Sequence, residues 1–176
     1  MTTAAGGDSG NEPAPAKINL SLHVRRRRAD GYHDLETLFA FTEFGDLLRA
    51  SPAADWSLTV DGPMAADLGP GPNLCPGADN LVLRAARAFA DAARPGCRPH
   101  AFRLEKHIPV AAGLGGGSAD AAAALRLLNR LHGGLLSPDA LVGIAATLGA
   151  DVPACLGLRS AFGTGTGTDL RPVPAP

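Results

Sequence analysis

The stretch from Ile108 to Leu131 constrains this chain more than any other, because it joins a glycine-rich loop directly to a helical pattern. Its glycines are Gly113, Gly115, Gly116 and Gly117. They lack side chains, so the backbone can take positive φ and a ligand can approach it closely. From Ser118 on, apolar residues recur at helical spacing, which predicts an α-helix that ends at Gly133-Gly134. The predicted buried face of this helix consists of Ala121, Ala124, Leu125 and Leu128.

A glycine loop that leads into a helix N-terminus is typical of an anion site. The first N–H groups of a helix have no partner within the helix, and the helix dipole favours negative charge there. We therefore expect the loop to bind a phosphate group. The structural alternative is a tight strand-to-helix turn without a ligand. Three consecutive glycines cost backbone entropy that such a turn rarely needs.

Three familiar nucleotide-binding patterns do not fit this sequence. A Walker A loop needs a lysine before its Ser or Thr, but Gly117 directly precedes Ser118. A dinucleotide-binding fingerprint needs a glycine where Ser118 stands, and an aspartate at the end of a strand about 20 residues later. A protein kinase needs His-Arg-Asp and Asp-Phe-Gly motifs, and the sequence has neither.

Alternating and apolar segments predict strands around three helices. In 16–24 the alternation places Ile18, Leu20, Leu22 and Val24 on the core side and Lys17 on the polar side. Further strands are predicted at 35–41, 46–50, 56–60, 101–106, 159–162 and 169–173. Helices are predicted after Asn80, after the glycine loop and after Ser137-Pro138. This order predicts an α+β domain with helices layered on one sheet.

Length and charge predict one globular domain. The chain has 176 residues and a formal net charge of −1, so no polyelectrolyte partner is indicated. Residues 1–13 lack a signal-peptide pattern, and we expect a disordered tail there, before a domain at 14–176. No run approaches the ~18 apolar residues that a membrane span needs. We therefore expect a cytoplasmic protein with no membrane and no nucleic-acid partner.

Four consecutive arginines, Arg25–Arg28, are the strongest local charge feature. Such a run can form a nucleic-acid patch or a targeting signal. Because the net charge is −1 and no other basic cluster occurs, a solvated strand end or turn is the favoured interpretation.

Four motifs together carry a resemblance to a known family. Residues 109–120, Pro-Val-Ala-Ala-Gly-Leu-Gly-Gly-Gly-Ser-Ala-Asp, resemble the glycine motif of the GHMP small-molecule kinases. Three other segments resemble one branch of that family: Pro-Ala-Lys-Ile-Asn-Leu at 15–20, Arg-Ala-Asp-Gly-Tyr-His at 28–33, and Gly-Ala-Asp-Val-Pro at 149–153. The four motifs occur in the family's order.

The resemblance implies a fold and an activity. The fold is the ribosomal-S5-domain-2-like α+β domain of the GHMP kinases, a mixed sheet with helices on one face. The activity is an ATP- and Mg²⁺-dependent phosphorylation of a cytidine diphosphate-linked methylerythritol at its 2-hydroxyl, in the non-mevalonate route to isoprenoid precursors. The family also has a second, C-terminal domain of roughly a hundred residues, which we expect to be absent here.

The resemblance gives Lys17 and Asp151 catalytic roles. Lys17 would orient the substrate hydroxyl and stabilise charge on the transferred phosphoryl group. Asp151 would be the general base, kept ionised by the nearby lysine. From the residues alone, Lys17 could be a solvated strand residue, and Asp151 could cap the segment that Pro153 begins.

The resemblance also implies a set of ATP-binding residues. These are Asn80, Lys106, Pro109, Val110, Ala111, Ala112, Gly113, Leu114, Gly115, Gly116, Gly117, Ser118 and Ala119. Ser118 would cap the loop helix, contact phosphate or Mg²⁺, or do both. Asn80 fits a helix cap equally well.

Tyr32, His33 and Asn19 are the implied substrate-binding residues. Tyr32 would stack on the cytosine and His33 would hydrogen-bond to it, because a flat ring and polar edge groups suit a base. Asn19 would lie beside Lys17 on the substrate side.

Two alternatives to an active kinase of this branch stay open. The chain could be a nucleotide-binding fragment without activity, or another GHMP kinase; Asp30-Gly-Tyr-His argues against the latter. The oligomeric state is open.

Overall fold

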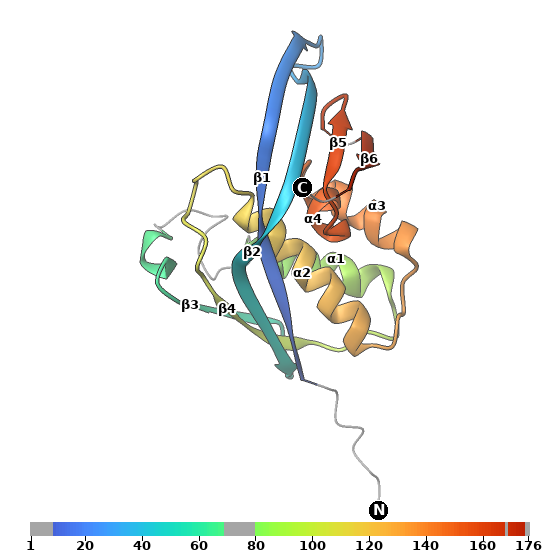
Figure 1. Ribbon diagram of the computed structural model, residues 1–176. Coiled ribbons are helices and arrows are strands. Elements are labelled where there is room, and N and C mark those ends of the chain that lie inside the picture. The colour runs from blue at the N-terminus through green and yellow to red at the C-terminus, as the bar shows by residue number, and fades with distance from the viewer. Residues whose placement is uncertain (1–8, 69–79, 168, 175–176) are drawn as a thin grey trace, which may run out of the picture.

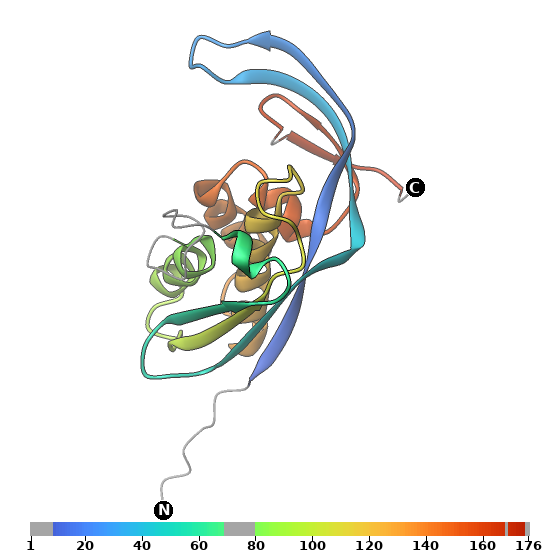
Figure 2. The ribbon, with the colours of Figure 1, turned by 90° about the vertical axis from the view of Figure 1, so that its left-hand side faces the viewer.

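The computed structural model describes residues 9–68, 80–167 and 169–174, which form one six-stranded sheet with helices on one side (Figures 1 and 2). The strands are β1 Gly10–Arg27, β2 His33–Pro52, β3 Ser57–Asp61, β4 His100–Glu105, β5 Ala161–Thr164 and β6 Asp169–Pro172. The helices are α1 Leu81–Ala92, α2 Gly116–Leu131, α3 Pro138–Leu148 and α4 Val152–Gly157, with a short 3-10 helix, η1, at Ala65–Asp67. The predicted α+β class is confirmed.

Strand β2 organises the sheet, because it pairs with three other strands. Strand β1 runs antiparallel along one edge of β2. On the other edge, residues 47–52 pair with β4 and residues 37–39 pair with β5. Strand β3 is parallel to β4, so the sheet is mixed, as predicted. The far half of the β1–β2 hairpin extends beyond the helices (Figure 1).

Helix α2 forms the centre of the core. Its residues 119–125 are all buried, together with Leu127 and Leu128. The helix contacts β1 and β2 on one side and α1, α3 and α4 on its other sides. Four consecutive alanines, 121–124, allow neighbouring elements to approach α2 closely from several directions. The predicted face of α2 is thus correct, but burial extends around most of the helix.

The predicted N-terminal caps of α1 and α3 are confirmed. The Asn80 side chain accepts a hydrogen bond from the Val82 N–H at 2.9 Å and caps α1. Ser137 caps α3 in the same way, with Pro138 in the first turn.

The predicted faces of β1 are wrong. Leu20, Leu22 and Val24 are 48%, 52% and 60% exposed, whereas Lys17 is only 5% exposed. The pairing of β1 with β2 shifts register between Pro15 and Lys17 and at two later points, which breaks the simple alternation. Beyond this, the outer half of β1 leaves the helical layer, so its apolar side chains have no core to enter.

The predicted tail is also too long. Strand β1 begins at Gly10, so residues 10–13 belong to the sheet, while residues 1–8 lie outside the described residues. Glu12 is fixed by two arginines of α2: Arg126 Nε lies 2.7 Å from Glu12 Oε1, and Arg130 forms a second ion pair with it. Arg126 also donates to the Cys155 carbonyl of α4 at 2.7 Å. The ion pairs of Glu12 thereby attach the start of β1 to α2, and Arg126 attaches α2 to α4.

The arginine run lies on the exposed part of the β1–β2 hairpin. Arg25 pairs with Glu36, Arg26 with Asp34 at 2.6 Å, and Arg28 with Asp30 at 3.0 Å. Acidic residues of the same hairpin thus neutralise most of the run, as expected for a solvated strand end rather than a polyanion-binding patch.

Within the described ranges, the helices are too short or too polar to cross a membrane. The cytoplasmic location stays a prediction.

Replacing Glu12 with glutamine should destabilise the fold. Its carboxylate is 9% exposed, so Glu12→Gln leaves the Arg126 charge poorly compensated. We expect a loss of about 2 kcal/mol in the free energy of unfolding, measured with urea. The control is Glu36→Gln, whose ion pair with Arg25 is exposed, so that this variant should unfold at nearly the same urea concentration as the wild type. Equal effects of the two variants would contradict the structural role of Glu12.

Candidate functional site

The glycine loop connects β4 to α2 in a conformation that needs its glycines. Ala111, Gly113 and Gly115 have φ of 56°, 75° and 66°, in the left-handed region that glycine adopts at little cost. Gly115 is the N-cap of α2, and no side chain caps the helix there. The first N–H groups of α2 therefore stay available for an anion.

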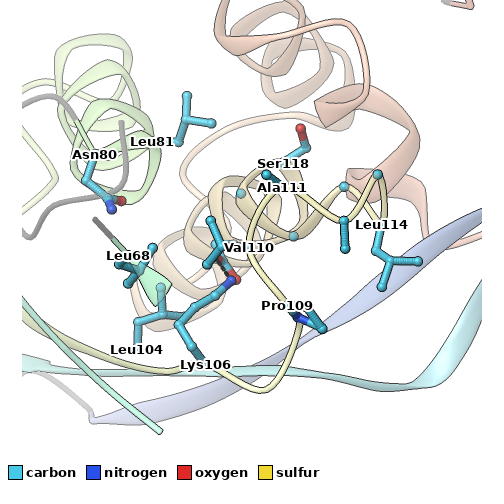
Figure 3. A pocket seen from close by; sticks show the side chains of 16 residues that line it. Leu68, Asn80, Leu81, Leu104, Lys106, Pro109, Val110, Ala111, Leu114 and Ser118 are labelled. Atoms are coloured by element: carbon cyan, nitrogen blue, oxygen red, sulfur yellow. Dashed lines mark hydrogen bonds and ion pairs between the residues drawn. The ribbon is translucent and has the colours of Figure 1, made fainter. Parts of the chain in front are cut away.

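The structure corrects the position of Ser118. Helix α2 begins at Gly116, so Ser118 lies inside the first turn and is not the N-cap. Ser118 lines the cavity beside the loop (Figure 3). Of the two predicted roles, contact with a ligand fits this position and capping does not.

A cavity of about 250 Å³ lies against the glycine loop (Figure 3). Its lining contains almost all predicted ATP-binding residues: Asn80, Lys106 and the loop from Pro109 to Ser118. Leu68, Leu81 and Leu104 add an apolar wall. Ala119 is the exception: it is 1% exposed, packs in the core and does not line the cavity. Asn80 caps α1 and lines the cavity, so its two predicted roles are compatible.

Lys17 of β1 contacts the C-terminal end of the glycine loop. Its N–H donates to the Leu114 carbonyl at 2.9 Å, and a Cβ on Gly115 would lie 3.5 Å from the Lys17 side chain. The Lys17 Nζ is 3.5 Å from Asp151 Oδ2 and donates to Asn19 Oδ1 at 3.0 Å. The three predicted residues Lys17, Asn19 and Asp151 are therefore brought together.

Asp151 is the accessible member of this group. It occupies the N-cap position of α4 but its side chain caps nothing, contrary to the capping interpretation. The Asp151 side chain is 52% exposed, whereas that of Lys17 is 6% exposed. A buried cation thus faces an open carboxylate beside a free helix N-terminus. This arrangement can place a hydroxyl group next to a base and a phosphate next to positive charge.

Lys106 lies beneath the loop in a buried cluster that the sequence interpretation missed. Its Nζ contacts Asp120 Oδ2 of α2 at 2.9 Å and also pairs with Asp46 of β2. Asp46 Oδ1 accepts the backbone N–H groups of His107 and Ile108, at 2.5 Å and 2.8 Å. An aspartate inside the apolar run 119–125 was the one sequence signal for this cluster.

The cluster has one lysine for two carboxyl groups. Burial raises the pKa of Asp120 to about 8, with Lys106 opposing this effect and Asp46 adding to it. Burial alone would lower the pKa of Lys106, but the charges and hydrogen bonds of Asp120 and Asp46 outweigh it and raise that pKa. Asp120 Oδ1 is buried without a hydrogen-bond partner among the described residues, which also favours the neutral acid. We assign the proton to Asp120 and the positive charge to Lys106.

Tyr32 and His33 lie elsewhere, at the end of the β1–β2 hairpin. They line a separate open hollow of about 340 Å³ together with Val24, Leu35 and Thr166. Tyr32 is 65% exposed, so its ring is available for stacking. The structure does not bring this pair into the glycine-loop cavity.

The state of Asp120 should appear in the pH dependence of stability. The pKa of Asp120 is raised from 3.8 to about 8 in the folded protein. The folded state therefore holds a proton that the unfolded state loses, and stability should fall as pH rises from about 4 to 8. Asp120→Asn keeps an oxygen for Lys106 but cannot ionise.

Urea unfolding of the wild type and of Asp120→Asn at several pH values between 5 and 8.5 measures this effect. We expect the wild type to lose more stability than the variant over this range. Parallel curves would contradict the assigned proton.

The sequence of this chain is similar to those of known proteins. Residues 80–157 match the family described as GHMP kinases N terminal domain. The chain is 50% identical over 165 residues to the 4-diphosphocytidyl-2-C-methyl-D-erythritol kinase of Bradyrhizobium sp. (strain ORS 278), covering 94% of this chain and 53% of the relative. The enzyme of the same name from Xanthobacter autotrophicus (strain ATCC BAA-1158 / Py2) is 54% identical over 157 residues, covering 89% and 51%.

The structure is also similar to solved structures of kinases. A crystal structure of 4-(cytidine 5'-diphospho)-2C-methyl-D-erythritol kinase superposes with a TM-score of 0.76 at 42% identity, covering 95% of this chain and 56% of that one. Mevalonate kinase from Methanococcus jannaschii, at 10% identity and a TM-score of 0.61, shares the fold. The chain spans about half the length of the curated relatives it matches.

Proposed function

Because this chain has the fold of a GHMP kinase N-terminal domain, we propose that it phosphorylates a small-molecule alcohol with ATP. The proposed acceptor is the 2-hydroxyl of 4-diphosphocytidyl-2-C-methyl-D-erythritol, in the synthesis of isoprenoid precursors. One observation carries the proposal: Lys17, Asp151 and the glycine loop come from distant parts of the chain and meet at the N-terminus of α2.

The glycine-loop cavity is the proposed ATP site. The free N–H groups at the start of α2 suit the phosphates, and the apolar wall of Leu68, Leu81 and Leu104 suits a less polar part of the nucleotide. The Ser118 hydroxyl is an oxygen donor of the kind that Mg²⁺ accepts. Mg²⁺ would neutralise charge on the phosphate oxygens during transfer.

The Lys17–Asp151 pair provides the chemistry at the acceptor. Asp151 takes the proton from the substrate hydroxyl, whose oxygen forms a bond to the γ-phosphorus while the bond to the β-phosphate oxygen breaks. The Lys17 ammonium stabilises negative charge on the moving phosphoryl group. Phosphoryl transfer needs mainly such positioning and electrostatic stabilisation.

The hollow at the hairpin end is the proposed site for the cytidine part of the substrate. Tyr32 offers an exposed ring for stacking and His33 a polar edge for hydrogen bonds. The cytosine and the 2-hydroxyl lie at opposite ends of the proposed substrate, so the two ends can occupy separate sites.

Replacing the proposed base should stop transfer without weakening nucleotide binding. We expect Asp151→Asn to lower kcat by at least about 100-fold, because the amide cannot accept the proton. A non-hydrolysable ATP analogue should bind the variant as it binds the wild type. The control is Asp139→Asn in the first turn of α3, which should keep wild-type turnover. Equal turnover by the wild type and Asp151→Asn would contradict the proposed base.

Ligand-induced shifts in Tm test the two half-sites separately. We expect an ATP analogue alone and cytidine diphosphate alone each to raise Tm, because both bind the folded state. Tyr32→Ala should remove the cytidine diphosphate shift and keep the ATP shift. If both ligands bind but the wild type has no turnover, the chain is a nucleotide-binding portion that needs a further component. If neither ligand raises Tm, the proposed function is wrong.

A further inference from the structure

A line of polar groups runs from the catalytic pair across the β1–β2 hairpin. Lys17 Nζ donates to Asn19 Oδ1 at 3.0 Å. Asn19 Nδ2 donates to Thr37 Oγ1 at 2.7 Å, and Thr37 Oγ1 donates to the Ser21 carbonyl at 2.9 Å. Thr37 lies in β2 and is only 4% exposed. Neither the sequence motifs nor the proposed function assigns a role to Thr37.

The Ser21 carbonyl, at the end of this hydrogen-bond chain, fixes the direction of every hydrogen bond in it. The Ser21 carbonyl can only accept, so the Thr37 hydroxyl must give it its single proton. The Thr37 oxygen then presents a lone pair to Asn19, which only the amide NH₂ group can use. The amide is thereby turned so that its carbonyl oxygen faces Lys17. The opposite orientation would point the NH₂ group at an ammonium, leave Thr37 without a donor and remove an acceptor from Lys17.

The packing around Thr37 holds its hydroxyl in this direction. Thr37 is opposite Gly163 of β5 in the sheet. A Cβ on Gly163 would lie 3.1 Å from the Thr37 methyl carbon, so the glycine provides the space that this methyl group occupies. A β-branched side chain has few χ1 choices, and the seated methyl group selects one of them. Thr37 does not line the glycine-loop cavity.

We propose that Thr37 is a positioning residue that sets the orientation of the Asn19 amide and, through it, the direction of the Lys17 ammonium. The proposal rests on the proposed role of Lys17 in phosphoryl transfer. Two acceptors from different elements then hold the ammonium: Asn19 Oδ1 from β1 and Asp151 Oδ2, at 3.5 Å, from the start of α4. Without the Asn19 acceptor, the Lys17 ammonium would turn toward Asp151. It would then compete with the substrate hydroxyl for the Asp151 carboxylate.

The composition of the chain makes a direct NMR test simple. The sequence has five asparagines and no glutamine, so the side-chain NH₂ region holds five pairs of signals. The loss of one pair in Asn19→Asp identifies Asn19. Thr37→Val keeps the shape of the side chain but lacks the hydroxyl, Thr37→Ser keeps the hydroxyl, and Thr37→Ala serves if the valine variant does not fold.

We expect the Asn19 signals to shift in Thr37→Val and Thr37→Ala and to stay near their wild-type positions in Thr37→Ser. The chain has two lysines, Lys17 and Lys106, so ¹³C-lysine labelling gives one further probe and an internal control. The Lys17 Cε signal should move with that of Asn19, while the Lys106 signal stays in place. Unchanged Asn19 and Lys17 signals in the variants without the hydroxyl would overturn the proposal.

Kinetics separate this inference from the proposed function. We expect Thr37→Val to lower kcat by about tenfold with little change in the KM for ATP, and Thr37→Ser to recover most of kcat. Partial unfolding would also lower the apparent kcat without changing KM, so kcat is calculated per folded enzyme, with the folded fraction taken from the NMR spectrum of each variant. If wild-type turnover is absent, the proposed function fails while the NMR result still decides the role of Thr37. If Thr37→Val shifts the Asn19 signals but keeps wild-type kcat, the amide orientation has no effect on transfer and the proposal is wrong.

Discussion

The glycine loop depends on one buried ammonium group, that of Lys106. Residues 106–108 begin the loop, and Asp120 follows it in α2; Lys106 joins the two through a contact of 2.9 Å. Asp46 then attaches this pair to β2 and accepts two backbone N–H groups at the start of the loop. A loop with several residues at positive φ has little intrinsic preference for one shape. Fixing both of its ends to the sheet supplies the order that its glycines lack.

The chain has two lysines, and both are buried at the candidate site, while the remaining basic residues other than histidine are arginines. The division has a chemical reason. An ammonium group is a compact charge that can be held by two or three acceptors in a small space, as at Lys17 and Lys106. The larger guanidinium suits the multiple contacts of Arg126, which joins a carboxylate and two carbonyl groups from β1 and α4. The lysine ammonium groups thus lie at the candidate site, and the Arg126 guanidinium holds β1, α2 and α4 together around it.

The sequence predicted the elements better than the contacts between them. The glycine loop, the caps at Asn80 and Ser137 and the core face of α2 depend on local chemistry, and each is confirmed. The faces of β1 are wrong because the alternation rule assumes an unbroken register and a core along the whole strand, and β1 has neither. Asp46 could not be predicted as a partner of Lys106, because 60 residues separate them and only the pairing of β2 with β4 brings them together. Glu12 escaped notice for the same reason, since its partners lie more than a hundred residues away in α2.

Small residues explain how these distant groups can meet at all. Alanines at 121–124 let β1, α1 and α4 approach α2 closely, so that Arg126 reaches both Glu12 and Cys155 from one helix turn. Gly115, at the start of the same helix, has a φ of 66°, which favours glycine, and lies against the Lys17 side chain, 3.5 Å from the position that a Cβ would take. A larger residue among the buried alanines would push β1 or α4 away from α2. The spacing between Lys17 and Asp151 is therefore set by the core packing of α2 as much as by the two side chains themselves.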